Sequence, residues 1–139
     1  MATVPWLPVG AAGDLSKQDP IKVTVTLGDE RNALKFVPNI VELETGKLYQ
    51  LILVNPSPQA HYFSSDSMAQ AVYTRKVQVL DAGGKTTAEI KGTVREIEVY
   101  PKGTTEWWFV PVKAGSFTDL KCTIAGHTEG GMTGTVVVK

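Results

Sequence analysis

Short runs of alternating apolar and polar residues, separated by Gly and Pro, make up most of this chain. In the clearest run, at 21–28, Ile21, Val23, Val25 and Leu27 alternate with Lys and Thr. A period of two residues is typical of a strand that buries one face. Further strands are predicted at 34–37, 39–43, 47–54, 76–80 and 86–91, around Ile97 and Val99, around Trp107, Trp108 and Phe109, and at 116–122 and 133–139.

The chain has no segment with a sustained helical period, so the pattern predicts an all-β protein. The expected fold is a Greek-key antiparallel β-sandwich of about seven to eight strands. Residues 61–73 lack strict alternation and are predicted to form a long connection, with one short helical turn around 67–71. Long connections of this kind are often functional.

Two strands carry predictions about which side chains face the core. In FTDLKC, alternation places Thr118, Leu120 and Cys122 on one face and the charged Lys121 on the other, so Cys122 should point inward. Neighbouring strand residues point to opposite sides of a sheet. Of the adjacent pair Trp107 and Trp108, one is therefore expected in the core and the other as an outer cover.

The N-terminal segment has no period and is rich in Pro and Gly. It predicts an irregular arm at 1–19, with Trp6 and Leu7 against the body, ahead of a single domain at 20–139. The arm has no basic flank and no long apolar run, so it predicts neither a signal peptide nor a transmembrane helix. A Met ahead of Ala-Thr-Val-Pro-Trp fits a mature exported chain with an added initiator.

Composition narrows the classes of partner. At 139 residues the chain is long enough for a core that needs no staples. Fourteen basic and fourteen acidic residues cancel and are scattered, which argues against nucleic-acid binding and against a polybasic membrane patch. The single cysteine excludes an internal disulfide.

The stretch LKCTIAGHTEGGMTGTVVV at 120–138 holds an unusual set of side chains. Cys122, His127 and Met132 are separated by four residues each, and the only other histidine is His61. Taken singly, these residues have ordinary roles as a small buried Cys, a capping His and a core Met. Together, a thiolate, an imidazole and a thioether at short fixed spacing suit copper better than other biological metals.

The glycines of this loop, Gly126, Gly130 and Gly131, let it fold back so that the three side chains converge. Zinc is a competing occupant, but structural zinc sites use a closed tetrahedron of Cys and His, and thioether is a poor zinc ligand. A Cys-His nucleophile is a second alternative, because His127 could activate Cys122. Met132 has no role in such a nucleophile.

On these residues the chain resembles the cupredoxins, the small blue copper proteins of the azurin, plastocyanin, auracyanin and rusticyanin kind. The resemblance is carried by FVPNIVEL at 36–43, GKLYQLILVN at 46–55 with His61 and Phe63 after it, and CTIAGHTEGGM at 122–132. The last loop is the most specific part, and its spacing is similar to that of auracyanin and rusticyanin. The resemblance implies one copper ion held by His61, Cys122, His127 and, on the axis, Met132.

Two positions depart from the family pattern. Tyr62 stands where the family often has an Asn that ties the two ligand loops together, and Asn55, Thr123 or backbone groups are the candidates to replace that tie. Glu129 lies on the ligand loop and competes with Met132 as an oxygen ligand, which would give a harder site nearer to that of red copper proteins.

A site with four protein ligands has no open position for a substrate, so the resemblance implies a carrier of single electrons and not an enzyme. The expected partners are redox proteins that dock transiently on a monomer, in the periplasm or a thylakoid lumen. Transfer is expected at the edge of His127, within an apolar rim drawn from Pro58, Ala60, Ile124, Ala125, Trp6 and Met68. The alternatives are a copper carrier or store that delivers copper to a partner, and a metal-free or catalytic domain of the same fold.

Overall fold

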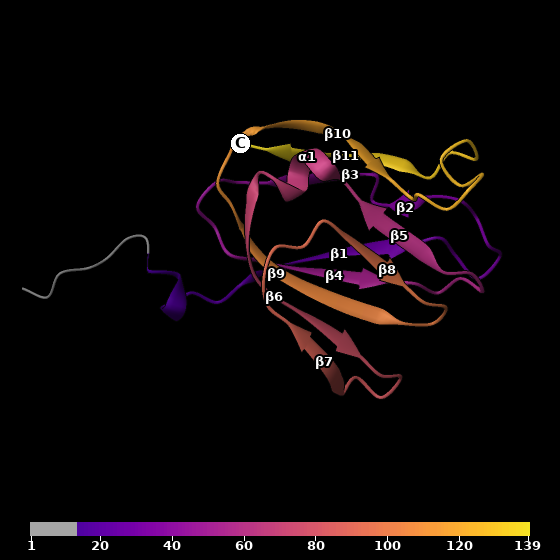
Figure 1. Cartoon of the computed structure of the whole chain (residues 1–139), viewed down its shortest axis with the longest axis horizontal. Coiled ribbons are helices and arrows are strands. Elements are labelled where there is room, and N and C mark those ends of the chain that lie inside the picture. The colour runs from indigo at the N-terminus through magenta and orange to yellow at the C-terminus, as the bar shows by residue number, and fades with distance from the viewer. Residues whose placement is uncertain (1–13) are drawn as a thin grey trace, which may run out of the picture.

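The computed structural model describes residues 14–139 and shows two β-sheets packed face to face (Figure 1). The six-stranded sheet has the order β2 (Phe36–Val37), β1 (Ile21–Leu27), β4 (Tyr49–Val54), β9 (Thr104–Pro111), β6 (Val72–Leu80) and β7 (Thr86–Ile90). The five-stranded sheet has the order β3 (Ile40–Leu43), β11 (Thr133–Val138), β10 (Gly115–Lys121), β5 (His61–Ser64) and β8 (Glu96–Val99). The prediction of an all-β sandwich is confirmed.

Both sheets are mixed, whereas a purely antiparallel sandwich was expected. Strands β1 and β4 pair in parallel, as do β3 and β11, and the other pairs are antiparallel. The chain passes from β2 in one sheet to β3 in the other and returns to β4, so strands that follow one another do not always pair. Alternation of side chains reports which face is buried and not which neighbour a strand has, so the parallel pairs have no signature in the pattern.

The inward faces of the two sheets meet in one core. It contains the following fully buried large side chains: Val25, Leu27, Leu43, Leu51, Leu53, Phe63, Met68, Trp107, Phe109, Leu120 and Met132. Trp107 is 2% exposed, whereas Trp108 is half-buried with Lys76 Nζ 4.5 Å above its ring. The prediction that one tryptophan packs in the core and the other covers the sheet is therefore confirmed.

The segment 61–73 is not the long connection that was predicted. It begins with β5, which pairs with β8, continues through the helix α1 (Asp66–Ala69), and leads into β6 at Val72. The helical turn was expected at nearly this place. Strand β5 was missed because Ser64, a polar residue, is buried beside Phe63, so the strand shows no alternation of residue types.

Strand β10 contains a bulge that changes the expected facing of one residue. Leu120 and Cys122 are buried, as predicted, but Thr118 is exposed and Phe117 is buried. The register against β11 shifts between Phe117 and Leu120, which adds a residue to one strand and reverses the alternation on its N-terminal side.

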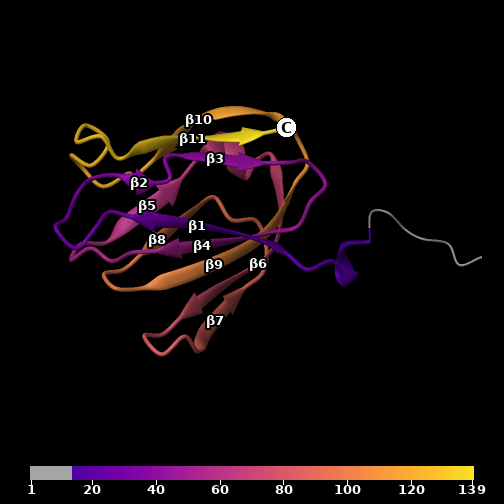
Figure 2. The same ribbon diagram turned by 180° about the vertical axis from the view of Figure 1, so that it is seen from behind.

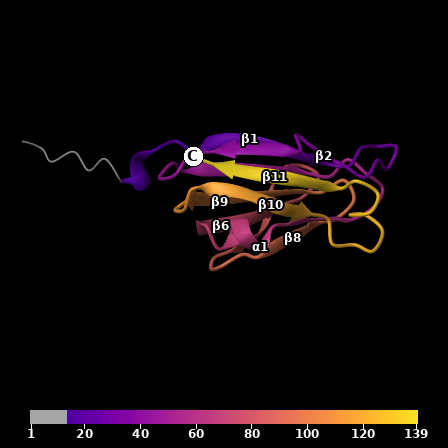
Figure 3. The same ribbon diagram turned by 90° about the horizontal axis from the view of Figure 1, so that it is seen from above.

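Several of the loops between strands lie at one end of the sandwich, away from the C-terminus. The loop from β10 to β11 and the loop from β4 to β5 both lie there (Figures 1 and 2), and the view from above shows the former projecting beyond the strands (Figure 3). At the other end lies the short 3-10 turn η1 (Leu15–Lys17), capped by Asp14. Trp6 and Leu7 lie outside the described residues. Within the described part, no helix is long and apolar enough to span a membrane.

Candidate metal centre

Three side chains from distant parts of the sequence converge at the loop end of the sandwich. His61 is the first residue of β5, Cys122 directly follows β10, and His127 lies in the turns before β11. Cys122 Sγ lies 3.9 Å from His61 Nδ1 and 3.3 Å from His127 Nδ1, and the two Nδ1 atoms lie 3.3 Å apart. Within residues 14–139 this is the one group of His, Cys, Asp and Glu side chains arranged to hold a metal ion.

The group is almost entirely removed from water. His61 and Cys122 are 0% exposed and His127 is 7% exposed. Burial lowers the pKa of His61, and the nearby His127 lowers it further, so the neutral imidazole that binds metals is favoured. A Cβ at Gly28, where φ is +73°, would lie 2.9 Å from His61 Nε2, so only glycine fits against this ring without displacement.

The ligand loop is held in shape by its own backbone. The N–H of His127 donates to the carbonyl of Ile124 across 3.0 Å, and the hydroxyl of Thr128 donates to the carbonyl of Cys122 across 2.9 Å. Gly126 and Gly131 adopt positive φ angles of +84° and +104°, in the left-handed region that favours glycine. The expectation that loop glycines allow the chain to fold back is met at these two positions.

Met132 closes the loop and lies beside the cluster. Its N–H donates to the carbonyl of His127, and its carbonyl accepts the N–H of Cys122, across 3.0 and 3.1 Å. The Met132 side chain is 0% exposed. Glu129, the competing candidate, is exposed and is not part of the metal-binding group.

A network of hydrogen bonds fixes the loop that leads to His61. Asn55 is 0% exposed, and its side-chain amide donates to the carbonyls of Gln59 and Val99 across 2.7 and 2.8 Å. The Asn55 side-chain oxygen accepts the N–H of Ser57. Val99 pairs with His61 in the β5–β8 ladder, so Asn55 joins the loop to the strand beside the histidine.

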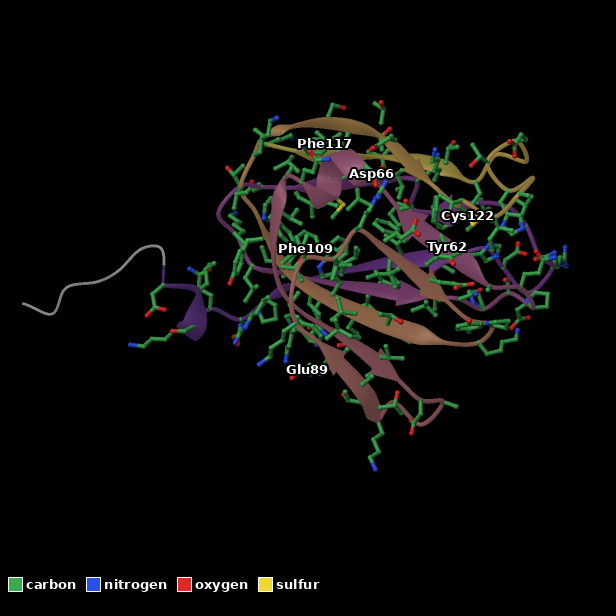
Figure 4. The ribbon with its side chains drawn as sticks, in the orientation of Figure 1. Tyr62, Asp66, Glu89, Phe109, Phe117 and Cys122 are labelled. Atoms are coloured by element: carbon green, nitrogen blue, oxygen red, sulfur yellow. The ribbon has the colours of Figure 1, made fainter. Side chains whose placement is uncertain are left out.

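The backbone of Tyr62 provides the contact between the first histidine strand and the cysteine. Its N–H donates to Cys122 Sγ across 3.3 Å, and its hydroxyl donates to Glu98 Oε2 across 2.8 Å. Tyr62 and Cys122 lie close together at the loop end (Figure 4). A backbone group thus connects the two loops, one of the replacements that the sequence left open.

The geometry fits a single ion bound by the three side chains. Ligand atoms about 2.0–2.3 Å from an ion at the centre of a trigonal plane lie about 3.5–4 Å apart. The observed separations of 3.3, 3.3 and 3.9 Å are close to these values. His61 Nε2 is buried without a hydrogen-bond partner among the described residues, so no hydrogen bond of this atom fixes the ring.

No family model matches the chain, and no curated protein sequence matches it. Solved structures do match. An auracyanin from Roseiflexus castenholzii is 16% identical, with a TM-score of 0.59 over 88% of this chain and 99% of that chain. Auracyanin A from Chloroflexus aurantiacus, a "blue" copper protein, is 18% identical, with a TM-score of 0.54 over 87% and 100%. The chain has a cupredoxin fold.

Larger copper proteins share this fold in part of their length. A copper-containing nitrite reductase from Thermus scotoductus is 15% identical, with a TM-score of 0.61 over 91% of this chain but only 32% of that chain. The cupredoxin fold therefore occurs both as a whole small protein and as one part of an enzyme. The present chain spans nearly the full length of the auracyanins that it matches.

The structure brings together His61, Cys122 and His127, and the main chain of Met132 is hydrogen-bonded to Cys122 and His127. It removes Met68 from the expected apolar rim, because that side chain is 1% exposed. The roles of Gly28 and Ser57 were not predicted. The Asn-Pro-Ser-Pro sequence before the histidine indicates a turn, and this was the only sign of a role for Ser57. For Gly28 the only sign was its place at the end of a predicted strand.

Proposed function

We propose that this chain is an electron carrier whose His61, Cys122 and His127 bind one copper ion, with Met132 as a weak axial ligand. The convergence of the two Nδ1 atoms and Sγ in a buried group carries the proposal. Copper bound to a thiolate and two imidazoles supplies one-electron redox chemistry. Zinc is disfavoured because the proposed fourth ligand is a methionine, whose thioether binds zinc poorly.

The protein contributes rigidity and exclusion of water. Main-chain hydrogen bonds hold two of the proposed ligands: Cys122 Sγ accepts the N–H of Tyr62, and the N–H of His127 donates to the carbonyl of Ile124. A site that is held in one shape costs little reorganisation when the charge changes. Burial leaves no open side for a substrate, so the site suits transfer of electrons and not catalysis.

His127 is the proposed route between the site and the solvent. It retains 7% exposure, whereas His61 and Cys122 retain none. The flanking loops present Pro58 and Ala125, both exposed, with Ala60 and Ile124 half-buried. These four residues form the proposed apolar rim, on which a redox protein docks transiently.

Delivery of copper to a partner is the weaker candidate. Carriers of that kind present several exposed thioether or imidazole groups. Apart from the initiator Met1, which lies outside the described residues, Met68 was the one spare thioether that could have served. Its side chain is buried in the core.

We propose further that the protein acts as a monomer in an exported compartment such as the periplasm or a thylakoid lumen, where a buried thiol and a copper site are compatible with oxidising conditions.

The visible spectrum of the protein after addition of Cu(II) tests the proposal. An intense thiolate-to-copper band that disappears in Cys122→Ala is expected, and Ser116→Ala, on the exposed part of β10, serves as the control that keeps it. Absence of the band in the native chain would contradict the proposal. Rapid loss of copper to a chelator would instead favour the delivery role.

A further inference from the structure

Thr128 makes an unusual contact inside the loop between β10 and β11. Its hydroxyl donates to the carbonyl of Cys122 across 2.9 Å. Apart from the contact between the ligand atoms of Cys122 and His127, the other hydrogen bonds within 122–132 join main-chain groups. Thr128 directly follows the proposed ligand His127, and its hydroxyl reaches back to the proposed ligand Cys122. One side chain therefore links the two ligands outside the metal site itself.

The peptide groups on both sides of the Cys122 Cα atom are held by the second half of this loop. The N–H of Cys122 donates to the carbonyl of Met132 across 3.1 Å, and its carbonyl accepts the hydroxyl of Thr128. These two bonds fix the direction in which the side chain leaves the main chain. The N–H of Tyr62, 3.3 Å from Sγ, then limits rotation of that side chain. Of the three bonds, only one has a side chain as its donor, and that side chain is Thr128.

The carbonyl of Cys122 has no substitute for this hydroxyl. Cys122 is 0% exposed, so its carbonyl does not reach water unless the loop moves. Within the described part of the chain, Thr128 is its one hydrogen-bond partner. A buried carbonyl left without a partner loses the free energy of its hydration, which exceeds the net gain from an average hydrogen bond. Loss of the hydroxyl should therefore shift the loop until this carbonyl is solvated.

Thr128 also shapes the turn that leads to Met132. The carbonyl of Thr128 accepts the N–H of Gly131 across 3.0 Å, and Gly131 adopts a φ of +104°. The next N–H, that of Met132, donates to the carbonyl of His127 across 3.0 Å. A shift of the main chain at Thr128 is therefore transmitted to Cys122 through the hydroxyl and to Met132 through the turn.

We propose that Thr128 is a positioning residue of the copper site, which holds the sulfur of Cys122 and the turn to Met132 in one arrangement. Thr128 acts through Cys122 and touches no proposed ligand atom. Ligands that stay in place while copper gains or loses one electron keep the reorganisation of the site small, and the groups that hold them tune the metal. The inference rests on the proposed function and adds to it a residue outside the ligand set.

The first test needs no copper. Hydrogen exchange of backbone amides, followed by NMR in the copper-free full chain, measures how often the loop opens. In Thr128→Val, the amides of Cys122, Gly131 and Met132 should exchange about threefold to tenfold faster than in the native chain. Thr128→Ser keeps the hydroxyl and should keep the native rates. Native rates in Thr128→Val would overturn the inference.

The second test follows the Cu(II)-loaded chain by visible absorption and by transfer of copper to EDTA. Thr128→Val should shift the maximum of the thiolate-to-copper band, because the direction of the sulfur changes, and should lose copper about threefold to tenfold faster. Thr128→Ser should restore both native values. Thr133→Val, the same replacement at an exposed threonine directly after Met132, is the control and should change neither.

The outcomes separate the inference from the proposed function. A band that keeps its maximum in Thr128→Val would overturn the positioning role, even if the loop exchanged faster, and the proposed copper site would stand. Values that Thr128→Ser does not restore would also overturn it, since the methyl group and not the hydroxyl would hold the site. A native chain without the band would contradict the copper site, and the exchange experiment would still decide whether the hydroxyl holds the loop.

Discussion

The backbone N–H of Tyr62 donates a hydrogen bond to the Sγ of Cys122 across 3.3 Å. Since His61 directly precedes Tyr62, this bond fixes two proposed ligands relative to each other. The contact is made by the main chain, so the side chain at position 62 need not be the Asn that cupredoxins often have there. Tyrosine is thus compatible with a rigid site.

Substitutions of Met132 test whether its thioether is the weak fourth ligand. Met132→Leu should lower the free energy of unfolding of the copper-free chain by less than about 1.5 kcal/mol, because the volume is nearly kept. Met132→Ala should lower it by about 2–5 kcal/mol, since the side chain is fully buried. Both variants should bind copper with a raised reduction potential, because loss of a donor disfavours Cu(II). Voltammetry and chemical denaturation measure the two effects.

Met68→Leu is the matched control, since Met68 is also buried but lies in α1, outside the ligand loop. It should change stability as little as Met132→Leu and leave the potential unaltered. Potentials that stay the same in both Met132 variants would remove this residue from the ligand set.

The two histidines should respond differently to replacement by glycine. His127→Gly opens the partly exposed side of the site, so added imidazole should enter and restore the thiolate-to-copper band. His61→Gly leaves a cavity that solvent does not reach, because His61 is 0% exposed, and imidazole should restore less. Titration of each variant with imidazole, followed by visible absorption, measures the difference. Equal recovery in the two variants would contradict the assignment of His127 as the accessible ligand.

The candidate site was predictable because its chemistry is concentrated in few residues. The chain has one Cys and two His, and Cys122, His127 and Met132 lie on one loop, so local spacing was enough to group them. The join with His61 is a long-range contact. It was inferred from resemblance and from the scarcity of ligands. The structure brings the ligand nitrogens of His61 and His127 and the sulfur of Cys122 together.

The parts that were missed depend on tertiary contacts. Strand β5 forms because β8 pairs with it, and its buried Ser64 hides the alternation. The bulge in β10 shifts the register, so Thr118 lies on the exposed face and not on the predicted buried face; the residue types do not indicate this shift. Met68 was a candidate for the apolar rim around His127, yet α1 packs it into the core. In each case a contact with another element decides the outcome, not the local pattern.

Asp119 gives a prediction about pH. Burial alone would raise its pKa, but hydrogen bonds from Ser65 and Ser67 outweigh burial and hold the pKa below its usual value. The ionised carboxylate therefore stabilises the fold at pH values above the unfolded pKa of about 3.9, and this contribution is lost as the pH falls through the folded pKa. Asp119→Asn should cost about 1–2 kcal/mol at neutral pH.

The cost of Asp119→Asn should shrink as the pH falls below the unfolded pKa of about 3.9, and it should vanish below the folded pKa, where the native carboxyl is protonated as well. Chemical denaturation of both proteins across this range measures it. Asp19→Asn, at an exposed position before β1, is the control and should show no such dependence. A cost that is the same at neutral and at low pH would show that the carboxylate charge is not the stabilising feature.

Asn55 tests whether the loop before His61 is held by buried hydrogen bonds. Asn55→Ala removes two donors and one acceptor and leaves the carbonyl of Val99 and the N–H of Ser57 without these partners. Each buried group left unpaired costs about 1–3 kcal/mol, so the free energy of unfolding should fall by about 3 kcal/mol. The loop ends at His61, and the copper-loaded variant should therefore also lose copper to a chelator faster than the native chain.

Gln59→Ala is the control for Asn55, because the Gln59 side chain is exposed while its main-chain carbonyl, which accepts from Asn55, is kept. Its stability should stay within about 0.5 kcal/mol of the native chain. If Asn55→Ala lowered stability but released copper no faster, the loop would be a structural brace that does not position His61. If Asn55→Ala changed neither the stability nor the rate of copper release, the hydrogen bonds to Gln59 and Val99 would not be what holds this end of the sandwich.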